Sequence, residues 1–211
     1  MQARSLAEIP EPELVTALCD DPMLRTWLFA PLLTGPRDRW LLQVPFIDLG
    51  IGRHNSDLDA VLLRDGNPID AVAYQIKRVK VTEATFATGL PGKLGEMPKA
   101  VRQANATAAL GFARVVLTFL VVADGRTRTE FNFAFRGPTG EIVGAINRAI
   151  DLTNLHDSVG VARIEVVQPL DRDFTLAGGI GGGFLRQPQP REQDAALSAA
   201  LERYGTKHGQ S

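Results

Sequence analysis

Apolar residues along the chain follow two periods, and together these periods predict both helices and strands. Four segments favour helices through apolar spacing or alanine content, over residues 11–33, 99–112, 139–154 and 194–205. Short apolar runs bounded by turn residues predict five strands, over residues 40–51, 57–63, 69–81, 113–123 and 159–170. The order of these elements predicts an α/β fold with a central mixed sheet flanked by helices.

Two connections between the predicted strands indicate how the sheet is assembled. An Asp-Gly pair lies between the strands at 57–63 and 69–81 and predicts an antiparallel hairpin. The helix at 99–112 then connects to the strand at 113–123, so this strand is expected to run parallel to the one before the helix. Pro45 cannot donate a hydrogen bond within a sheet, so its strand is expected at a sheet edge or a bulge.

Composition changes towards the C-terminus. Residues 176–193 are rich in glycine and proline and predict a flexible linker. The main domain is therefore expected over residues 1–175, with a short helix and tail over 194–211. Glycine and proline also predict a loop over residues 82–98.

Charge is distributed unevenly along the chain, although the net charge is only −1. Residues 1–76 contain six Lys and Arg against eleven Asp and Glu, and residues 77–129 contain nine against three. An acidic segment followed by a basic one could form a metal-binding cluster beside a phosphate-binding surface. The alternative is that solvated surface charges vary this much without any such role.

Membrane and disulfide chemistry are not indicated. No apolar stretch approaches the roughly 20 residues that a membrane-spanning helix needs, and the first residues lack the pattern of a signal peptide. Cys19 is the one cysteine, so no internal disulfide is possible. A cytoplasmic protein without a membrane partner is expected.

Four polar side chains mark the predicted hairpin. Because side chains alternate along a strand, Asp57 and Asp59 are expected on one face of the first strand. By the same rule, Gln75 and Lys77 share a face of the second strand. The predicted register places Asp59 opposite residues 73–74. If both polar sets face the same side, an acid, an amide oxygen and an ammonium group lie close together.

This combination of groups suits the hydrolysis of a phosphodiester. Mg²⁺ or Mn²⁺ prefers hard oxygen ligands, which an acid, the Gln75 amide and the backbone carbonyl of Ile76 could provide. The ion would lower the pKa of a bound water, and Lys77 could orient that water or stabilise charge on the phosphate. The predicted catalytic residues are Asp59, Gln75 and Lys77.

The spacing Asp59-x₁₅-Gln75-x-Lys77 resembles that of the PD-(D/E)XK nuclease superfamily, in particular a branch of restriction endonucleases with Gln in place of an acid. The resemblance covers residues 11–123. It implies a restriction-endonuclease-like α-β-β-β-α-β core in which Asp59 binds the metal, Gln75 replaces the second acid and Lys77 is catalytic. Asp57 competes with Asp59 for the ligand role.

The resemblance also implies further site residues. The family often adds a Glu from the first helix, a place that Glu13 or Glu11 could take. The predicted metal ligands are then Asp59, Gln75, Ile76, Asp57 and Glu13. The predicted nucleic-acid contacts are Arg78, Lys80, Lys93, Lys99, Arg102 and Gln103.

The sequence thus predicts a magnesium- or manganese-dependent endonuclease that acts on nucleic acid, with DNA preferred, in restriction, defence or repair. The terminal helix could support a homodimer. Two alternatives stay open: a nuclease fold that only binds nucleic acid or protein, and a nucleotidyltransferase that uses the Asp57-x-Asp59 pair.

Overall fold

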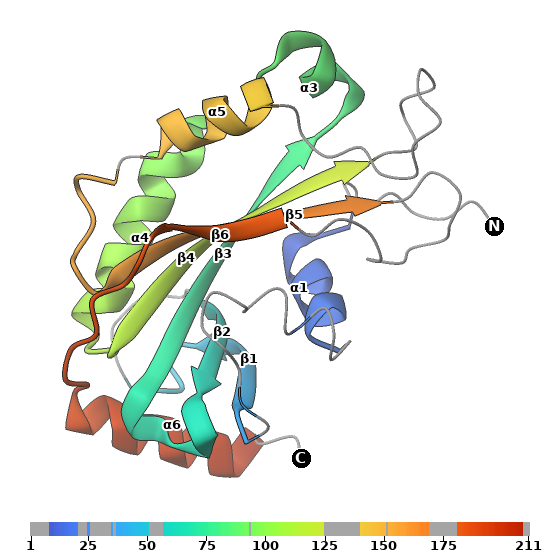
Figure 1. Cartoon of the computed structure of the whole chain (residues 1–211). Helices are drawn as coiled ribbons and strands as arrows, with labels where there is room; N and C mark the ends of the chain where they lie inside the picture. The colour runs from blue at the N-terminus through green and yellow to red at the C-terminus, as the bar shows by residue number, and fades with distance from the viewer. Residues whose placement is uncertain are drawn as a thin grey trace.

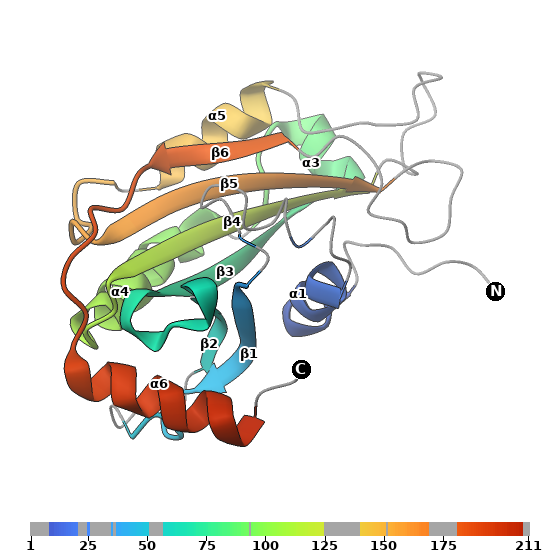
Figure 2. The same cartoon turned by 60° about the horizontal axis from the view of Figure 1, so that its bottom comes forward.

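Six strands form one mixed sheet in the computed structural model, which describes residues 9–20, 25, 35, 37–50, 57–92, 94–124, 140–150, 152–168 and 181–208. The order in the sheet follows the chain (Figures 1 and 2). The strands are β1 (Arg39–Pro45), β2 (Asp57–Leu63), β3 (Ala71–Val81), β4 (Arg114–Asp124), β5 (Val159–Gln168) and β6 (Gly181–Arg186). The predicted α/β class, a mixed sheet flanked by helices, is confirmed.

Helices cover both faces of this sheet. The helices are α1 (Glu11–Asp20), α3 (Glu83–Thr88), α4 (Met97–Ala109), α5 (Gly140–Ala149) and α6 (Ala195–His208). Three 3₁₀ turns accompany them, η2 (Arg64–Gly66), η3 (Pro68–Asp70) and η4 (Leu94–Glu96). Apolar residues of α4, α5 and α6 share one hydrophobic cluster, and those of α1 belong to a second cluster on the other face. We call these sides the α4 face and the α1 face.

The strand directions change within the sheet. β1, β2 and β3 are antiparallel neighbours, whereas β3, β4 and β5 run parallel. β6 returns antiparallel to β5. The predicted parallel pairing of the strands on either side of helix α4 is confirmed, and β1 with Pro45 lies at the sheet edge as expected. β4 is buried on both faces because it lies in the middle of a sheet covered by helices.

The hairpin between β2 and β3 differs from the predicted one by a single residue of register. Asp65 and Gly66 have positive φ angles of 51° and 72°, as the Asp-Gly signal indicates. The connection spans residues 64–70, however, because two 3₁₀ turns follow one another, and Asn67 accepts a hydrogen bond from Ile69 N–H. The partner of Ala60 is therefore Tyr74, one residue beyond the predicted position. The predicted loop over 82–98 likewise contains α3 and η4.

The predicted linker is wrong for residues 181–186, which form strand β6. Glycine fills its first three positions, so the strand carries no apolar alternation that a sequence pattern could show. The chain then crosses β5 closely, since a Cβ on Gly160 would lie 2.5 Å from Cδ of Pro188. The C-terminal residues are consequently part of the main fold rather than a separate appendage.

Residues 191–194 connect this C-terminal segment to the start of β3 and to the residues before β4. The buried Gln193 accepts hydrogen bonds from Ala71 N–H at 3.0 Å and from Ala113 N–H at 3.5 Å. Its amide donates to Pro68 O and to Ser198 Oγ. One amide side chain thus connects the first residue of β3, the approach to β4 and helix α6.

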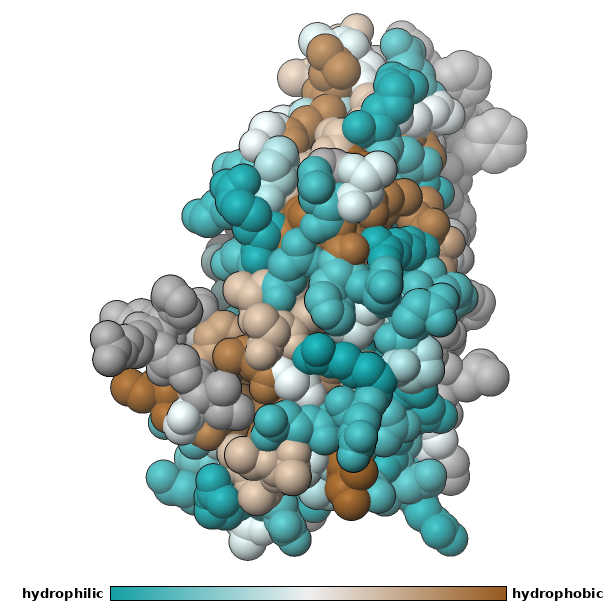
Figure 3. Space-filling view, turned by 90° about the vertical axis from the view of Figure 1, so that its left-hand side faces the viewer, coloured by the Kyte–Doolittle hydropathy of each residue, from teal (hydrophilic) through white to brown (hydrophobic). Residues whose placement is uncertain are grey.

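The α4 side of the molecule is largely polar on its surface. Polar side chains cover most of this view, with small hydrophobic areas between them (Figure 3). Helix α4 directs Ala100, Val101, Ala104 and Ala108 into the core. Its charged and amide side chains consequently lie towards solvent and towards the neighbouring part of β3.

Candidate active site

The strands β2 and β3 separate in the middle of the sheet. Their pairing extends from Leu63 opposite Ala71 to Ala60 opposite Tyr74. β3 continues beside β4 as far as Val81, whereas Asp57 and Leu58 of β2 pair only with β1 and Asp59 pairs with neither strand. The two strands therefore form a fork that opens at Asp59. From Gln75 onwards, the edge of β3 that faces this fork has no ladder partner among the described residues.

Gln43 of β1 lies beside the point where the fork opens. The pairs Leu42–Ala60 and Val44–Leu58 flank it, so Gln43 lies across from Asp59 on the neighbouring strand. Its φ angle of 48° is in the left-handed region, which a residue with a side chain rarely adopts within a strand. Its buried Nε2 has no hydrogen-bond partner in the described part of the chain. Backbone strain and a buried unpaired amide thus coincide at this point.

The side-chain alternation of β2 changes at the same place. Ala60 lies in the cluster on the α1 face, and strict alternation would put Leu58 there too. Leu58 instead belongs to the cluster on the α4 face. Asp59, between them, directs its carboxylate across the fork towards β3. The strict alternation from which a shared face of Asp57 and Asp59 was predicted therefore does not hold at this point of β2.

Two carboxylates occupy the place of a neighbouring strand along the β3 edge. Oδ2 of Asp59 accepts a hydrogen bond from Ile76 N–H at 2.6 Å. Oε2 of Glu11, in the first turn of α1, accepts one from Arg78 N–H at 2.6 Å. Successive residues of a strand alternate their backbone groups between its two neighbours, so both N–H groups and the intervening Ile76 carbonyl point into the fork.

Gln75 and Lys77 lie on the α4 face of β3, in line with Ala71, Ala73 and Val79 of the cluster beneath α4. Gln75 is 3% exposed, and its amide donates to the backbone oxygen of Asp57 at 3.4 Å. Nζ of Lys77 is 3.9 Å from Oε1 of Glu11. Glu11 therefore contacts β3 with both of its oxygens.

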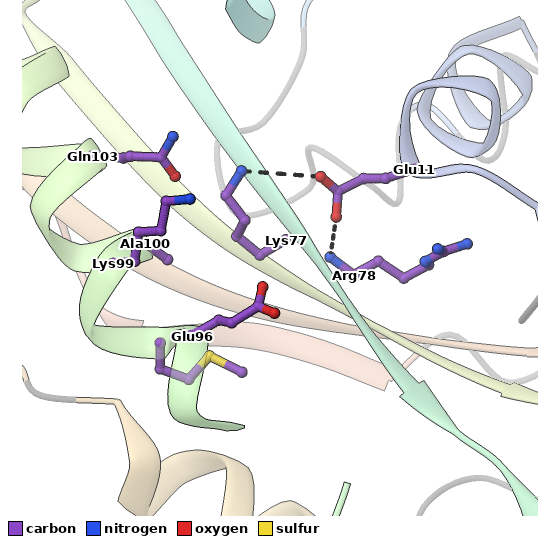
Figure 4. A pocket seen from close by; sticks show the side chains of 8 residues that line it. Glu11, Lys77, Arg78, Glu96, Lys99, Ala100 and Gln103 are labelled. Atoms are coloured by element: carbon purple, nitrogen blue, oxygen red, sulfur yellow. Dashed lines mark hydrogen bonds and ion pairs between the residues drawn. The ribbon is translucent and has the colours of Figure 1, made fainter. Parts of the chain in front are cut away.

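A pocket of about 210 Å³ lies beside Lys77. Figure 4 shows Lys77 between Glu11 on one side and Lys99 and Gln103 of α4 on the other. The pocket is lined by Glu11, Lys77, Arg78, Glu96, Met97, Lys99, Ala100 and Gln103. The pocket brings cationic and amide groups of β3 and α4 together beside Glu11, whereas Asp59 and Gln75 are not among its lining residues.

The electrostatic surroundings of Asp59 are unusual for a carboxylate. The pKa of Asp59 is raised from 3.8 to about 6, mainly by burial and also by the charges of Glu11 and Asp57. The hydrogen bond from Ile76 and the Lys77 ammonium act in the opposite direction and lower the pKa. The carboxyl group can therefore gain or lose a proton near neutral pH, which is useful in acid–base chemistry.

The remaining predicted residues have different surroundings. Asp57 and Glu13 are exposed, and Glu11 rather than Glu13 reaches the pocket. The side chain of Arg78 points away from α4 in Figure 4. Lys80 is half-buried, and strand alternation places it on the same side of β3 as Arg78.

Other predicted contacts lie on or near α4. Arg102 and Lys99 are exposed on this helix, and Gln103 lies one turn beyond Lys99 at the pocket. Lys93 lies outside the described residues. Sequence reasoning missed Gln43 and Glu96. The one available signal for Gln43 was its position as the lone polar residue in an apolar run, Trp40 to Pro45, and nothing marked Glu96.

Comparisons with known proteins add no family. No protein-family model matches the chain, and no curated protein matches its sequence. Within the described part of the chain, no helix is long and apolar enough to cross a membrane. Over the same residues, no three His, Cys, Asp or Glu side chains form a group that could hold a metal ion.

Proposed function

We propose that the chain is a metal-dependent nuclease that hydrolyses phosphodiester bonds in nucleic acid, with DNA as the first substrate to test. The observed order of elements from α1 to β4 supports a restriction-endonuclease-like core, with α3 and η4 added before α4. Asp59, Gln75 and Lys77 keep the spacing of the PD-(D/E)XK superfamily. The fork brings these three residues to neighbouring positions.

The observation that carries the proposal is the pair of carboxylates on the open edge of β3. Asp59 comes from β2 and Glu11 from α1, yet both accept hydrogen bonds from the backbone of β3. Each acid binds one of two N–H groups that are two residues apart on the edge facing the fork. A water molecule could satisfy these N–H groups equally well if capping were the only requirement. Instead two acids are held beside a lysine and a buried amide, although burial disfavours the charged form of Asp59.

The oxygen donors at the fork suit a divalent cation of the magnesium type. Each carboxylate uses one oxygen for the backbone and keeps a second, and the Ile76 carbonyl points into the same opening. Asp59, Glu11 and the Ile76 carbonyl would hold the ion, with the Gln75 amide oxygen as a further donor. When bound, such an ion supplies a water of lowered pKa and offsets the charge of the phosphate.

The protein's own groups would then perform three tasks. Lys77 would hold the attacking water or stabilise negative charge that develops on the phosphate. Lys99 and Gln103 would bind phosphate oxygens at the pocket and orient the strand. Glu11 would set the position of Lys77 through the ion pair at 3.9 Å.

Cleavage assays test this function directly. Supercoiled, linear and single-stranded DNA would be incubated with the protein and Mg²⁺ or Mn²⁺, and Lys77→Ala and Asp59→Ala would be compared with the wild type. We expect cleavage by the wild type and a loss of about 100-fold or more in each variant, since each removes a group that acts on the transition state.

Two exposed residues remote from the fork provide matched controls. Arg148→Ala removes a cation from α5, and Glu192→Gln neutralises a carboxylate in the C-terminal segment. Both variants should cleave like the wild type. Cleavage that persists in Lys77→Ala and Asp59→Ala would contradict the proposal, as would a wild type that binds DNA but never cleaves it.

A second candidate is a nuclease-like fold that binds nucleic acid without cutting it. The observation in its favour is that both carboxylates already accept backbone hydrogen bonds, a purely structural task. Salt-sensitive DNA binding without cleavage in either metal would identify this function. The nucleotidyltransferase hypothesis gains less support, because Asp57 is exposed while Asp59 turns into the fork.

A further inference from the structure

The C-terminal half of helix α6 carries an aromatic pair on its surface. The rings of Tyr204 and His208 are stacked, with centroids 4.5 Å apart and an angle of 29° between their planes. His208 is exposed and Tyr204 is half-buried. The two residues are one helical turn apart, so their rings cover each other's facing sides and the exposed His208 forms the outer end of the stack.

Helix α6 places this pair next to β2. Leu197, Ala200 and Leu201 of the helix belong to the same hydrophobic cluster as Leu58 of β2. On the same helix, a Cβ on Gly205 would lie 3.9 Å from the Leu63 side chain. Figure 2 shows α6 running below β1 and β2 towards the C-terminus. The C-terminal half of α6 therefore packs near the hairpin end of β2, on the α4 face of the sheet.

Electrostatics connects the aromatic pair with the fork. Burial raises the pKa of the Tyr204 phenol, and the carboxylates of Asp48 and Asp57 raise it further. Asp57 also acts on the Asp59 carboxyl group. Asp57 begins β2 two residues before Asp59, where the fork opens.

Two cationic residues lie beside the aromatic pair on the helix. Arg203 and Lys207 are exposed and are also one turn apart, each directly before one member of the pair. A basic row beside an aromatic row is the arrangement by which proteins bind a single nucleic-acid strand, with phosphates on the cations and bases on the rings. Cations at a helix C-terminus also interact favourably with the negative end of the helix dipole, but that role requires no aromatic neighbours.

We propose that Tyr204 and His208 of α6 form a stacking platform for an unpaired base of the nucleic acid, with Arg203 and Lys207 as contacts for its backbone. This inference rests on the proposed function and names its substrate class. The preferred substrate would carry a single-stranded segment in addition to the phosphodiester cleaved at the fork. A fully paired duplex would keep its bases stacked within the helix and gain nothing from the platform.

Binding measured without cleavage tests the platform by itself. A fluorescent oligothymidine and a blunt duplex of the same length would be titrated in EDTA with the wild type, Tyr204→Leu, Tyr204→Phe and His208→Ala. Tyr204→Leu keeps apolar volume where the side chain packs on the core, and Tyr204→Phe keeps the ring. Circular dichroism melting would confirm that each variant is folded.

We expect Tyr204→Leu and His208→Ala to weaken oligothymidine binding by about 5-fold to 100-fold, the range for the loss of one stacked base. Tyr204→Phe should bind like the wild type, and duplex binding should change in none of these variants. Equal losses on oligothymidine and duplex would overturn the platform, as would unchanged binding in Tyr204→Leu and His208→Ala.

The outcomes also separate this inference from the proposed function. If the wild type cleaves DNA while the platform variants bind oligothymidine normally, the platform alone is wrong. If the wild type binds neither oligonucleotide, both the platform and the nuclease proposal are contradicted. Selective loss of oligothymidine binding supports the platform even where no cleavage is observed, and the nuclease proposal is then judged by the cleavage assay.

Discussion

The backbone N–H and C=O groups of strand β3 find different hydrogen-bond partners along its two edges. On the β4 side, pairing continues without a gap from Val72 opposite Arg114 to Val81 opposite Ala123. On the β2 side it ends at Ala60 opposite Tyr74, and carboxylates of Asp59 and Glu11 replace the missing strand. A neighbouring strand uses the backbone groups that face β3 in the ladder of hydrogen bonds. A carboxylate binds one N–H group with one oxygen and has a second oxygen for another contact. The contrast indicates which side of β3 serves as scaffold and which is available for function.

The same contrast holds for the energetics of the two regions. The contacts of the C-terminal segment with the sheet depend on a close backbone approach at Gly160 and on satisfied hydrogen bonds at Gln193. The fork contains features that disfavour folding: a buried acid of raised pKa, a strained Gln43 and an unpaired amide. Proteins tolerate such costs mainly at functional sites. Substitutions in the two regions should therefore have opposite effects on stability and activity.

The largest effect on stability is expected at the scaffold end. Gly160→Ala would place a Cβ 2.5 Å from Pro188 Cδ and 2.9 Å from its backbone nitrogen, so the crossing segment must shift. We expect a loss of about 3 kcal/mol in the free energy of unfolding, which corresponds to a melting temperature roughly 6–12 °C lower. Thermal melting followed by circular dichroism measures this change.

Gly183→Ala in β6 is the matched control for this substitution. A Cβ at Gly183 meets no atom within 4 Å, so the unfolding free energy should change by less than about 0.5 kcal/mol. Equal effects at the two glycines would contradict the close crossing of β5 by the C-terminal segment.

A stability effect of opposite sign is expected at Asp59. Its pKa is about 6 in the folded protein and 3.8 in the reference state, so the folded state binds the proton more tightly. The stabilisation from this group is complete below pH 3.8 and is lost as the pH rises through 6. The difference amounts to about 3 kcal/mol, because one pKa unit corresponds to about 1.4 kcal/mol.

Asp59→Asn removes the titrating group and keeps an oxygen for Ile76 N–H. In EDTA at pH 8 we expect this variant to unfold at higher urea concentration than the wild type, by up to about 3 kcal/mol in free energy. The unfolding free energy of this variant should also no longer fall between pH 4 and 6. Urea titrations across this pH range measure both properties. A wild type that shows no such decline, or an Asn variant less stable at pH 8, would argue against a costly buried carboxylate.

The smallest effect is expected at Gln43. Gln43→Gly would relieve the left-handed strain at φ 48°, worth about 1–2 kcal/mol, and also remove the unpaired amide. Glycine would offset about 0.5–1 kcal/mol of this through the entropy of the unfolded chain. A net stabilisation of up to about 1 kcal/mol in urea unfolding is therefore expected. Clear destabilisation would show that Gln43 supports the fold instead of straining it.

The sequence predicted the regular parts of the fold well. The apolar run at residues 113–123 identified the central strand, and the helix before it indicated the parallel pairing with β3. β6 was missed because its glycines carry no side chains from which a pattern could be read. The register of the hairpin was missed by one residue because the length of a turn with two 3₁₀ segments cannot be derived from Asp-Gly alone.

The candidate site could be predicted only where its residues are local in the sequence. Gln75 and Lys77 share a face of one strand, which alternation alone predicts. The choice of Glu11 over Glu13 depends on how α1 packs against β3, a contact across more than sixty positions of the chain. The turn of Asp59 into the fork depends on the backbone conformation of Gln43, which no residue pattern specifies.

The most direct test of the account is the position of a divalent cation. A crystal of the wild type soaked in Mn²⁺ would be examined by anomalous diffraction. We expect a peak in the fork at about 2.0–2.4 Å from the Asp59 carboxylate and the Ile76 carbonyl, and its loss in Asp59→Ala. A fork without such a peak at saturating Mn²⁺, with Asp59 and Glu11 still bound to β3, would contradict the account.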